Sequence, residues 1–132
     1  MTAKLTIGFL GAGKMATALA RGFIRAGLLT AGEVIASDPS EAARASFAKD
    51  VGAKTTAHNP EVAKFADVLV LAVKPDQVAG VLADIRNCFT PKHCLISIAA
   101  GVPLLKLEAG LGAGARLIRV MQIGRASCRE RV

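Results

Sequence analysis

Small residues near the N-terminus have the spacing of a backbone phosphate cradle. Gly11 to Ala16 reads Gly-Ala-Gly-Lys-Met-Ala, and it follows the apolar run Ile7 to Leu10. Gly11 is expected to allow a tight turn, Gly13 to let the backbone approach a pyrophosphate, and Ala16 to let helix and strand pack closely. Free N–H groups and the positive end of the helix dipole then attract the anion. The pattern predicts a dinucleotide-binding turn, although a strand, turn and helix that only pack tightly would share it.

A second phosphate motif overlaps the first. Gly8 to Lys14 fits the Gly-x-x-x-x-Gly-Lys part of a nucleoside-triphosphate loop. Met15 stands where that loop needs a hydroxyl group for magnesium, and the intervening residues include strand positions. The sequence therefore favours a dinucleotide over a nucleoside triphosphate.

An acidic residue, Asp38, follows the second expected strand. A carboxylate at this place commonly accepts hydrogen bonds from the adenosine ribose and repels a 2′-phosphate, which would favour NADH over NADPH. The run Asp38 to Glu41 also reads as a helix cap, with Pro39 at the first helical position and Glu41 closing a capping box. Because both roles can coexist, the preference between NAD and NADP stays open.

Other candidate contacts follow the third, fourth and fifth expected strands. Ala72 to Pro75 reads Ala-Val-Lys-Pro, where a dinucleotide could cross the strand end and Lys74 could face phosphate or ribose. Ala99 to Gly101 reads Ala-Ala-Gly, which leaves room for a flat ring against the backbone. Ordinary tight turns explain both runs as well. Asn59 before Pro60 is an N-cap ahead of a proline-initiated helix, unless its amide also reaches the adenosine.

Strand-like and helix-like segments alternate along the chain, which is typical of βαβ units. The expected strands are Leu5–Leu10, Val34–Ser37, Lys54–Thr56, Val68–Val73, Leu95–Ile98 and Leu117–Val120. The expected helices are Met15–Ala26, Pro39–Lys49, Glu61–Phe65, Asp76–Arg86 and Pro103–Leu111. With right-handed crossovers, these elements predict a single α/β domain with a doubly wound, mostly parallel sheet of Rossmann type and strand order 3-2-1-4-5-6. Ligand is expected at the carboxyl ends of the first and fourth strands.

The first expected helix has the clearest pattern. Met15, Leu19 and Phe23 recur every four residues, with Ala16 beside them, and predict one apolar stripe that lies on the sheet. Gly27 is expected to end this helix.

Composition narrows the class of protein. The 132 residues are 52% hydrophobic, which suits one α/β domain with a buried sheet. No apolar run is long enough to predict a membrane span, and no signal-peptide pattern precedes the first strand, so a cytoplasmic protein is expected. The net charge of +7 comes with only 4% aromatic residues, and the basic residues are scattered, so neither nucleic acid nor membrane is an expected partner.

Cysteine and histidine show no pattern of metal or redox chemistry. Cys88, Cys94 and Cys128 lack metal-like or redox spacing and are expected to be small buried hydrophobic residues. His58 and His93 stand alone and are expected in loops. We therefore predict no metal site.

Residues 122–132 differ in composition from the apolar segment that precedes them. They read Gln-Ile-Gly-Arg-Ala-Ser-Cys-Arg-Glu-Arg-Val, which matches one reading frame of a widely used sequencing adapter. We therefore predict a dinucleotide-binding domain over residues 1–121 and a non-native tail over 122–132, with a genuine basic tail as the alternative. Part of the positive charge then belongs to the tail.

Four motifs together resemble the N-terminal half of pyrroline-5-carboxylate reductases. They are Phe9 to Ala16, Ala72 to Pro75, Ala99 to Gly101 and Arg119 to Met121, and the resemblance covers residues 5–121. It implies a domain that holds NADP or NAD while hydride passes to the C=N carbon of a cyclic imino acid, giving L-proline. It also implies these cofactor contacts: Leu10, Gly11, Ala12, Gly13, Lys14, Met15, Asp38, Asn59, Ala72, Val73, Lys74, Pro75, Ala99, Ala100 and Gly101.

The chain departs from this family after Met121. The family continues with Pro-Asn-Thr-Pro and a helical domain. In the family, that domain builds a homo-oligomer, binds the substrate carboxylate and supplies a hydroxyl for protonation. In this chain, Gln122 begins an unrelated sequence instead. The resemblance therefore implies an imino-acid substrate for the intact parent, no catalytic residue in this chain and no turnover by it. The alternatives are a stand-alone NAD(P)-binding or redox-sensing module and another two-domain NADP-dependent reductase. The Ala-Val-Lys-Pro and Ala-Ala-Gly runs argue against the second.

Overall fold

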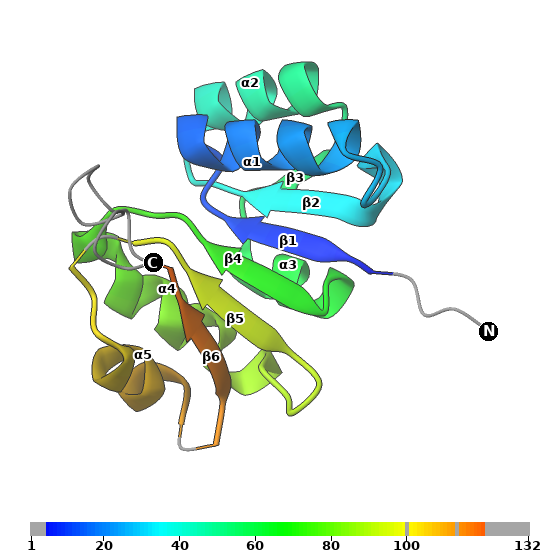
Figure 1. The fold of residues 1–132 in the computed structure, drawn as a ribbon. Coiled ribbons are helices and arrows are strands. Elements are labelled where there is room, and N and C mark those ends of the chain that lie inside the picture. The colour runs from blue at the N-terminus through cyan, green and yellow to red at the C-terminus, as the bar shows by residue number, and fades with distance from the viewer. Residues whose placement is uncertain (1–4, 100, 113, 121–132) are drawn as a thin grey trace, which may run out of the picture.

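The computed structural model describes residues 5–99, 101–112 and 114–120. These residues form a six-stranded sheet whose paired strands are all parallel, in the order β3-β2-β1-β4-β5-β6 (Figure 1). The predicted α/β class and the predicted order 3-2-1-4-5-6 are confirmed. The order reverses between β1 and β4, which is where doubly wound sheets bind their ligands.

The elements follow the expected alternation, with ends that differ by a few residues. The strands are β1 (Ile7–Leu10), β2 (Val34–Ser37), β3 (Lys54–Thr56), β4 (Val68–Leu71), β5 (Cys94–Ser97) and β6 (Arg116–Arg119). The helices are α1 (Lys14–Arg25), α2 (Glu41–Val51), α3 (Asn59–Phe65), α4 (Val78–Ile85) and α5 (Leu104–Leu111). Short 3₁₀ turns occupy η1 (Ala31–Glu33), η2 (Pro75–Gln77) and η3 (Arg86–Cys88). Strand β4 ends at Leu71, two residues before the predicted end at Val73, because the chain turns toward η2.

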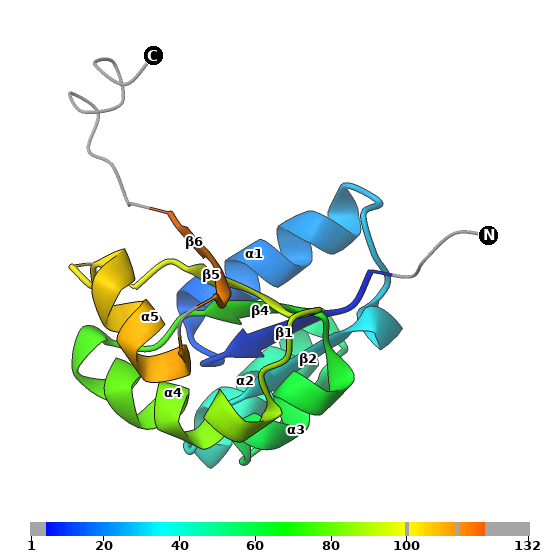
Figure 2. The same ribbon diagram turned by 90° about the horizontal axis from the view of Figure 1, so that it is seen from below.

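Two layers of apolar side chains pack against opposite faces of the sheet. On the face covered by α1 and α2, Phe9 from β1 meets Phe47 from α2 with ring centroids 6.0 Å apart, and both rings are fully buried. Figure 2 shows α1 on one side of the sheet and α4 and α5 on the other. Because β1 and β2 are buried on both faces, they read as continuous apolar runs rather than as alternating ones.

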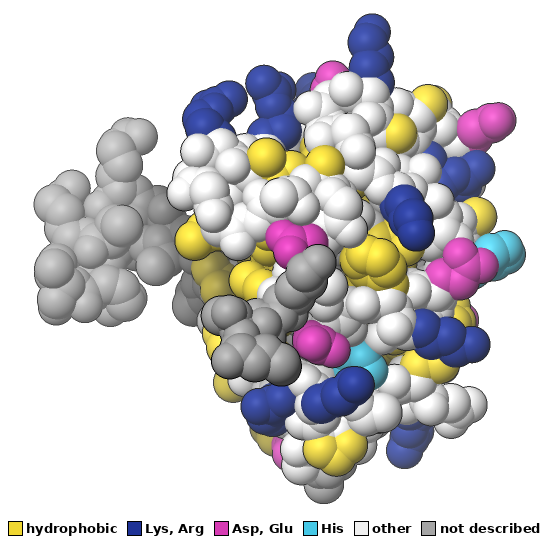
Figure 3. All heavy atoms as spheres, turned by 90° about the vertical axis from the view of Figure 1, so that its right-hand side faces the viewer, with side chains coloured by type: hydrophobic (Ala, Val, Ile, Leu, Met, Phe, Trp, Pro, Cys, Tyr) yellow, Lys and Arg dark blue, Asp and Glu magenta, His cyan; other side chains and the backbone are white. Residues whose placement is uncertain are grey.

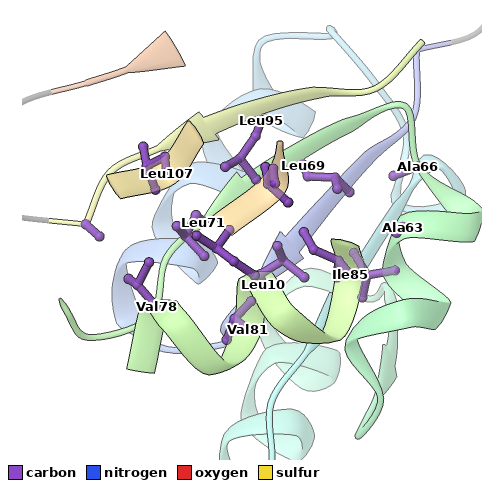
Figure 4. Close-up of a cluster of buried hydrophobic side chains, with 14 of the residues drawn as sticks. Leu10, Ala63, Ala66, Leu69, Leu71, Val78, Val81, Ile85, Leu95 and Leu107 are labelled. Atoms are coloured by element: carbon purple, nitrogen blue, oxygen red, sulfur yellow. The ribbon is translucent and has the colours of Figure 1, made fainter. Parts of the chain in front are cut away.

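The second layer lies under α3, α4 and α5 (Figure 4). Leu10, Leu71 and Leu95 project from three neighbouring strands, and Val78 and Ile85 meet them from α4. Val78, Val81, Leu82 and Ile85 recur at helical spacing in α4, and all four are buried. This layer anchors the strand ends from which the candidate contacts extend.

Helix α1 packs on the sheet through two small residues and through Leu19 and Phe23 of the predicted stripe, which are partly buried against the layer covered by α1 and α2. Ala16 and Ala20 are fully buried, whereas Met15 is 44% exposed, so the prediction that Met15 belongs to the buried stripe is wrong. The close approach expected at Ala16 is confirmed. Gly27, with φ +81°, ends the helix as predicted, because Leu28 N–H then reaches back to a carbonyl of the last turn.

Helix α2 begins two residues later than the sequence predicts. Its N-cap is Ser40, whose Oγ accepts a hydrogen bond from Ala43 N–H at 3.2 Å. The predicted cap at Asp38, with Glu41 closing a box, is therefore wrong. The Asp38 carboxylate takes other partners, described below.

His93 lies in the loop before β5, as predicted, yet its side chain is only 4% exposed. Its Nδ1 accepts the N–H of Thr90 at 2.9 Å, which leaves Nε2–H to donate to the Ala63 carbonyl at 2.7 Å. The ring therefore ties this loop to α3. His58 is exposed and precedes α3.

The prediction of buried cysteines holds only in part. Cys88 and Cys94 are half-buried free thiols, the first packed against the layer under α3, α4 and α5, and Cys128 lies outside the described residues. On the side of the molecule where the strands begin, acidic side chains lie between basic ones (Figure 3). Among the described residues, no helix combines the length and apolar character that crossing a membrane requires.

Candidate dinucleotide-binding site

The carboxyl ends of the central strands meet at one edge of the sheet. In the observed register, Leu10 lies beside both Ser37 and Leu71, and Leu71 lies beside Ser97. The segments predicted to contact a cofactor follow directly after these residues. The fold therefore gathers the glycine turn, Asp38, Ala72–Pro75 and Ala99 at the predicted edge.

Gly11 makes the turn after β1 possible. Its φ of +111° is one that side chains rarely adopt, and a Cβ there would lie 2.9 Å from the Ala72 carbonyl oxygen. Its N–H donates to the Ser37 carbonyl at 2.8 Å. The tight turn predicted at Gly11 is thus present, and Gly11 is packed directly against Ala72 and Val73 at the end of β4.

The N–H groups of the turn divide into two sets. Those of Gly11 and Ala12 are already bonded inside the protein, the second to Asp38 Oδ2 at 3.0 Å. In the described part of the chain, those of Gly13 and Lys14 have no hydrogen-bond partner. The expectation that the whole turn offers free N–H groups is therefore corrected, because β2 holds its first half.

Gly13 leaves the start of α1 open. A Cβ at this position would meet no atom within 4 Å, and no side chain caps the helix. The first turn of α1 contains no acidic residue, and Lys14 is exposed at its start. A helix start of this kind, with unpaired N–H groups and no competing carboxylate, suits an anion.

Asp38 links the turns that follow β1 and β2. Its Oδ2 accepts from Ala12 N–H, its Oδ1 accepts from Ser40 N–H at 2.9 Å, and its carbonyl accepts from Arg44 Nη1 at 2.8 Å. The carboxylate therefore holds the glycine turn in place. The bond from Arg44 places a cation beside the turn that follows β2.

Asn59 is the first residue of α3, and His58 is the N-cap, so the predicted N-cap role of Asn59 is wrong. The Asn59 side chain instead bonds to residues of two neighbouring elements, β2 and α4. Asn59 Oδ1 accepts the hydroxyl of fully buried Ser37 at 2.5 Å, and Asn59 Nδ2 donates to Asp84 Oδ2 on α4 at 3.1 Å. Hydrogen bonds thus run from β2 through α3 to α4 across the site.

Two hollows flank the glycine turn. A cleft of about 440 Å³ has in its lining Gly11, Ser37, Asn59, Val73, Gly80 and Asp84. A groove of about 450 Å³ runs between α1 and α2, and begins at Gly13 and Lys14. The cleft lies at the reversal of strand order, where a bound dinucleotide is expected.

The remaining predicted contacts lie along the same edge. Ala72 N–H donates to the Leu10 carbonyl at 2.8 Å, and Lys74 and Pro75 are exposed beyond it. Ala99 is buried, and Gly101 is exposed with φ +73°. Ala100 lies outside the described residues.

Sequence reasoning missed the side chains of Ser37, Arg44 and Asp84. Each lies within a helix or strand and belongs to no motif. Only the place of Ser37 as the one polar residue that closes an apolar strand could have drawn attention to it. The other two become relevant through contacts that the fold creates.

Comparison with known proteins agrees with this geometry. Residues 6–101 match the model of the family described as NADP oxidoreductase, coenzyme F420-dependent. Over 115 residues, the chain is 42% identical to the pyrroline-5-carboxylate reductase of Methanosarcina acetivorans, covering 87% of this chain and 43% of that protein. The resemblance to pyrroline-5-carboxylate reductases is thereby confirmed.

Solved structures give the same result. The pyrroline-5-carboxylate reductase of Coxiella burnetii superposes with a TM-score of 0.85 at 32% identity, over 96% of this chain and 47% of that one. The Plasmodium falciparum pyrroline carboxylate reductase, solved with NADP bound, gives 0.77 at 32% identity, over 89% and 42%. The chain spans less than half the length of these relatives. Its matched residues include the glycine turn and strands β1 to β5, and the chain belongs to the NADP oxidoreductase, coenzyme F420-dependent, family.

Proposed function

We propose that this chain is the N-terminal, cofactor-binding part of a pyrroline-5-carboxylate reductase, which reduces the C=N bond of 1-pyrroline-5-carboxylate to L-proline with NADPH or NADH. The observation that carries the proposal is the 42% identity over 115 residues to the Methanosarcina acetivorans reductase. The open helix start at Gly13 and the cleft beside Gly11 support it independently, because they suit a dinucleotide.

The residues present fit such a cofactor. The N–H groups of Gly13 and Lys14 would hold the pyrophosphate at the start of α1. Asp38 and Asn59 would contact the adenosine half. The small residues of Ala72–Pro75 and Ala99–Gly101 would leave room for the nicotinamide ring. When bound in reduced form, the nicotinamide supplies a hydride.

We further propose that the chain binds the cofactor without turning over substrate. It covers 43% of the Methanosarcina acetivorans enzyme, and hydride transfer needs the imino acid and the nicotinamide held at reacting distance. None of its own residues is then catalytic. The remainder of the parent would hold the imino acid and join the subunits of a cytoplasmic homo-oligomer. Neither nucleic acid nor membrane has a part in this function.

Residues 1–121 form the dinucleotide-binding domain in this proposal, and residues 122–132 are not native. Recovery of the longer genomic sequence tests both statements. Pro-Asn-Thr-Pro after Met121, followed by a helical second half, would support the reductase. A natural stop codon there would instead favour a stand-alone module that binds NAD(P) or senses redox state.

Binding and turnover are tested separately on the purified 132-residue chain. Titration with NADPH or NADH, followed by nucleotide fluorescence, should give saturable binding. Proline formation from 1-pyrroline-5-carboxylate should stay at the rate measured without protein. A folded chain that binds neither nucleotide contradicts the cofactor role, and robust proline formation contradicts the absence of turnover.

A further inference from the structure

The partners of Asn59 fix the direction of its amide group. Its oxygen receives the hydroxyl of buried Ser37 at 2.5 Å, and its nitrogen lies 3.1 Å from Asp84 Oδ2. If the amide were flipped, its oxygen would face a carboxylate oxygen, and neither atom could donate. Asn59 therefore presents its NH₂ group beside the carboxylate of Asp84.

This pair combines one donor and one acceptor in the lining of the cleft. The NH₂ group has two hydrogens, of which Asp84 takes one, and the described residues provide no acceptor for the second. Asp84 is exposed, so its carboxylate keeps lone pairs available to a ligand. Next to the pair, α4 lines the cleft with Gly80 and Val81, which carry no polar side chain.

We propose that Asn59 and Asp84 together read the base of the bound cofactor and select adenine. The inference rests on the proposed function, because the adenosine half must enter this cleft. Adenine carries its amino group beside a ring nitrogen that accepts. The amino group would donate to Asp84 while the ring nitrogen accepts from Asn59, so one charged and one neutral hydrogen bond would hold the same edge of the base.

A base without the amino group breaks this match. Hypoxanthine has a carbonyl oxygen in place of the amine, and in the same position that oxygen would face the Asp84 carboxylate, leaving two acceptors together. A site that hydrogen-bonds an N–H group rejects the analogue that lacks it. Asp84 is therefore a specificity-determining residue, which acts on the base rather than on the ribose or the nicotinamide.

The test compares NADH with reduced nicotinamide hypoxanthine dinucleotide, titrated into the 132-residue chain. The wild type should bind NADH about tenfold more tightly. Asp84→Asn should bring the two affinities within about twofold, because a carboxamide can turn to accept from the amine or donate to the carbonyl. Asp67→Asn makes the same change of charge in the turn before β4, at the opposite edge of the sheet, and should keep the wild-type ratio.

Thermal melting of all three proteins shows whether the variants are folded, and each possible result has a distinct meaning. Equal affinities in the wild type overturn base selection and leave the proposed function standing. Absence of binding to either nucleotide overturns the proposed function, and base selection with it. A tenfold ratio that persists in folded Asp84→Asn overturns the role given to Asp84.

Discussion

The two halves of the sheet differ in how completely they are covered. Every residue of β1 and β2 is buried, since α1 and α2 pack on one face and α3 on the other. In β5, buried residues alternate with partly exposed ones, and in β6, exposed residues alternate with partly exposed ones. Strands β1, β2 and β4, which form the complete half, are thus buried on both faces almost throughout, whereas α4 and α5 cover only one face of β5 and β6, the open half.

The same difference distinguishes the surroundings of the glycine turn from those of β6. Parallel sheets are normally covered on both faces, yet Ile118 and Val120 are 49% and 46% exposed. Nearby, Arg119 Nε is buried without a hydrogen-bond partner among the described residues. The clamp on the glycine turn, from Ser37 and Asp38, lies in the complete half. The molecule therefore combines the features proposed for cofactor binding with one sheet face that the described residues leave exposed.

The largest contrast should come from one substitution made in both halves. Ile35→Ala empties a position that is 6% exposed in β2, and should lower the free energy of unfolding by about 2–5 kcal/mol. Ile118→Ala in β6 should lower it by less than about 1 kcal/mol, because that side chain is half exposed. Urea unfolding measures both. Equal losses would mean that the outer face of β6 is covered in solution.

Substitution of two glycines in the same turn should affect different properties, stability for Gly11 and nucleotide affinity for Gly13. Gly11→Ala places a methyl group 2.9 Å from the Ala72 carbonyl oxygen at φ +111°, and should destabilise the protein by about 2–3 kcal/mol. Gly13→Ala meets no protein atom and should change stability by less than about 0.5 kcal/mol. Its methyl group should nevertheless weaken NADH binding about tenfold, because it covers the N–H groups at the start of α1. Unchanged affinity in Gly13→Ala would place the pyrophosphate elsewhere.

The sequence predicted the sheet and the glycine turn well. Periodicity and the glycine motif located all six strands, their order and the turn at Gly11, because these features arise from local pattern and from the handedness of crossovers. Local pattern also produced the errors. Asp38 reads as a cap from its neighbours, but its carboxylate bonds Ala12, which is 26 positions away.

Local sequence patterns could not predict which side chains connect one element to another. Asp84 becomes part of the site only because α4 packs beside α3, which brings it to Asn59. The alternating exposure of β6 was equally hidden. Leu117 and Ile118 are adjacent apolar residues on opposite faces of the strand, and the burial of each depends on whether something covers its face.

Asp38 offers a smaller test within the complete half. Asp38→Asn keeps an oxygen for Ala12 N–H, gives up the exposed contact with Ser40 N–H and removes the negative charge, so the glycine turn should stay in place. Loss of the charge should raise the affinity for NADPH relative to NADH by up to about tenfold, because the 2′-phosphate is no longer repelled. Titration of both nucleotides measures the ratio. Asp67→Asn is again the control, and an unchanged ratio in Asp38→Asn would limit Asp38 to its structural contacts.

The smallest effect is expected at the free edge of β6. Val120 N–H donates to the Ser97 carbonyl at 2.8 Å, and since backbone direction alternates along a strand, the polar groups of Arg119 and Leu117 point away from β5. An open edge beside exposed apolar side chains favours association between copies.

Weak self-association should therefore appear, with a dissociation constant on the order of 0.1 mM. Ile118→Lys should shift the chain toward monomer, because a lysine beside the edge opposes both apolar contact and strand pairing. Sedimentation at several concentrations measures the change. Lys106→Arg, at an exposed position of α5, is a control that keeps the charge. A wild type that stays monomeric at millimolar concentration would show that exposure of one sheet face and one edge is not enough to drive association.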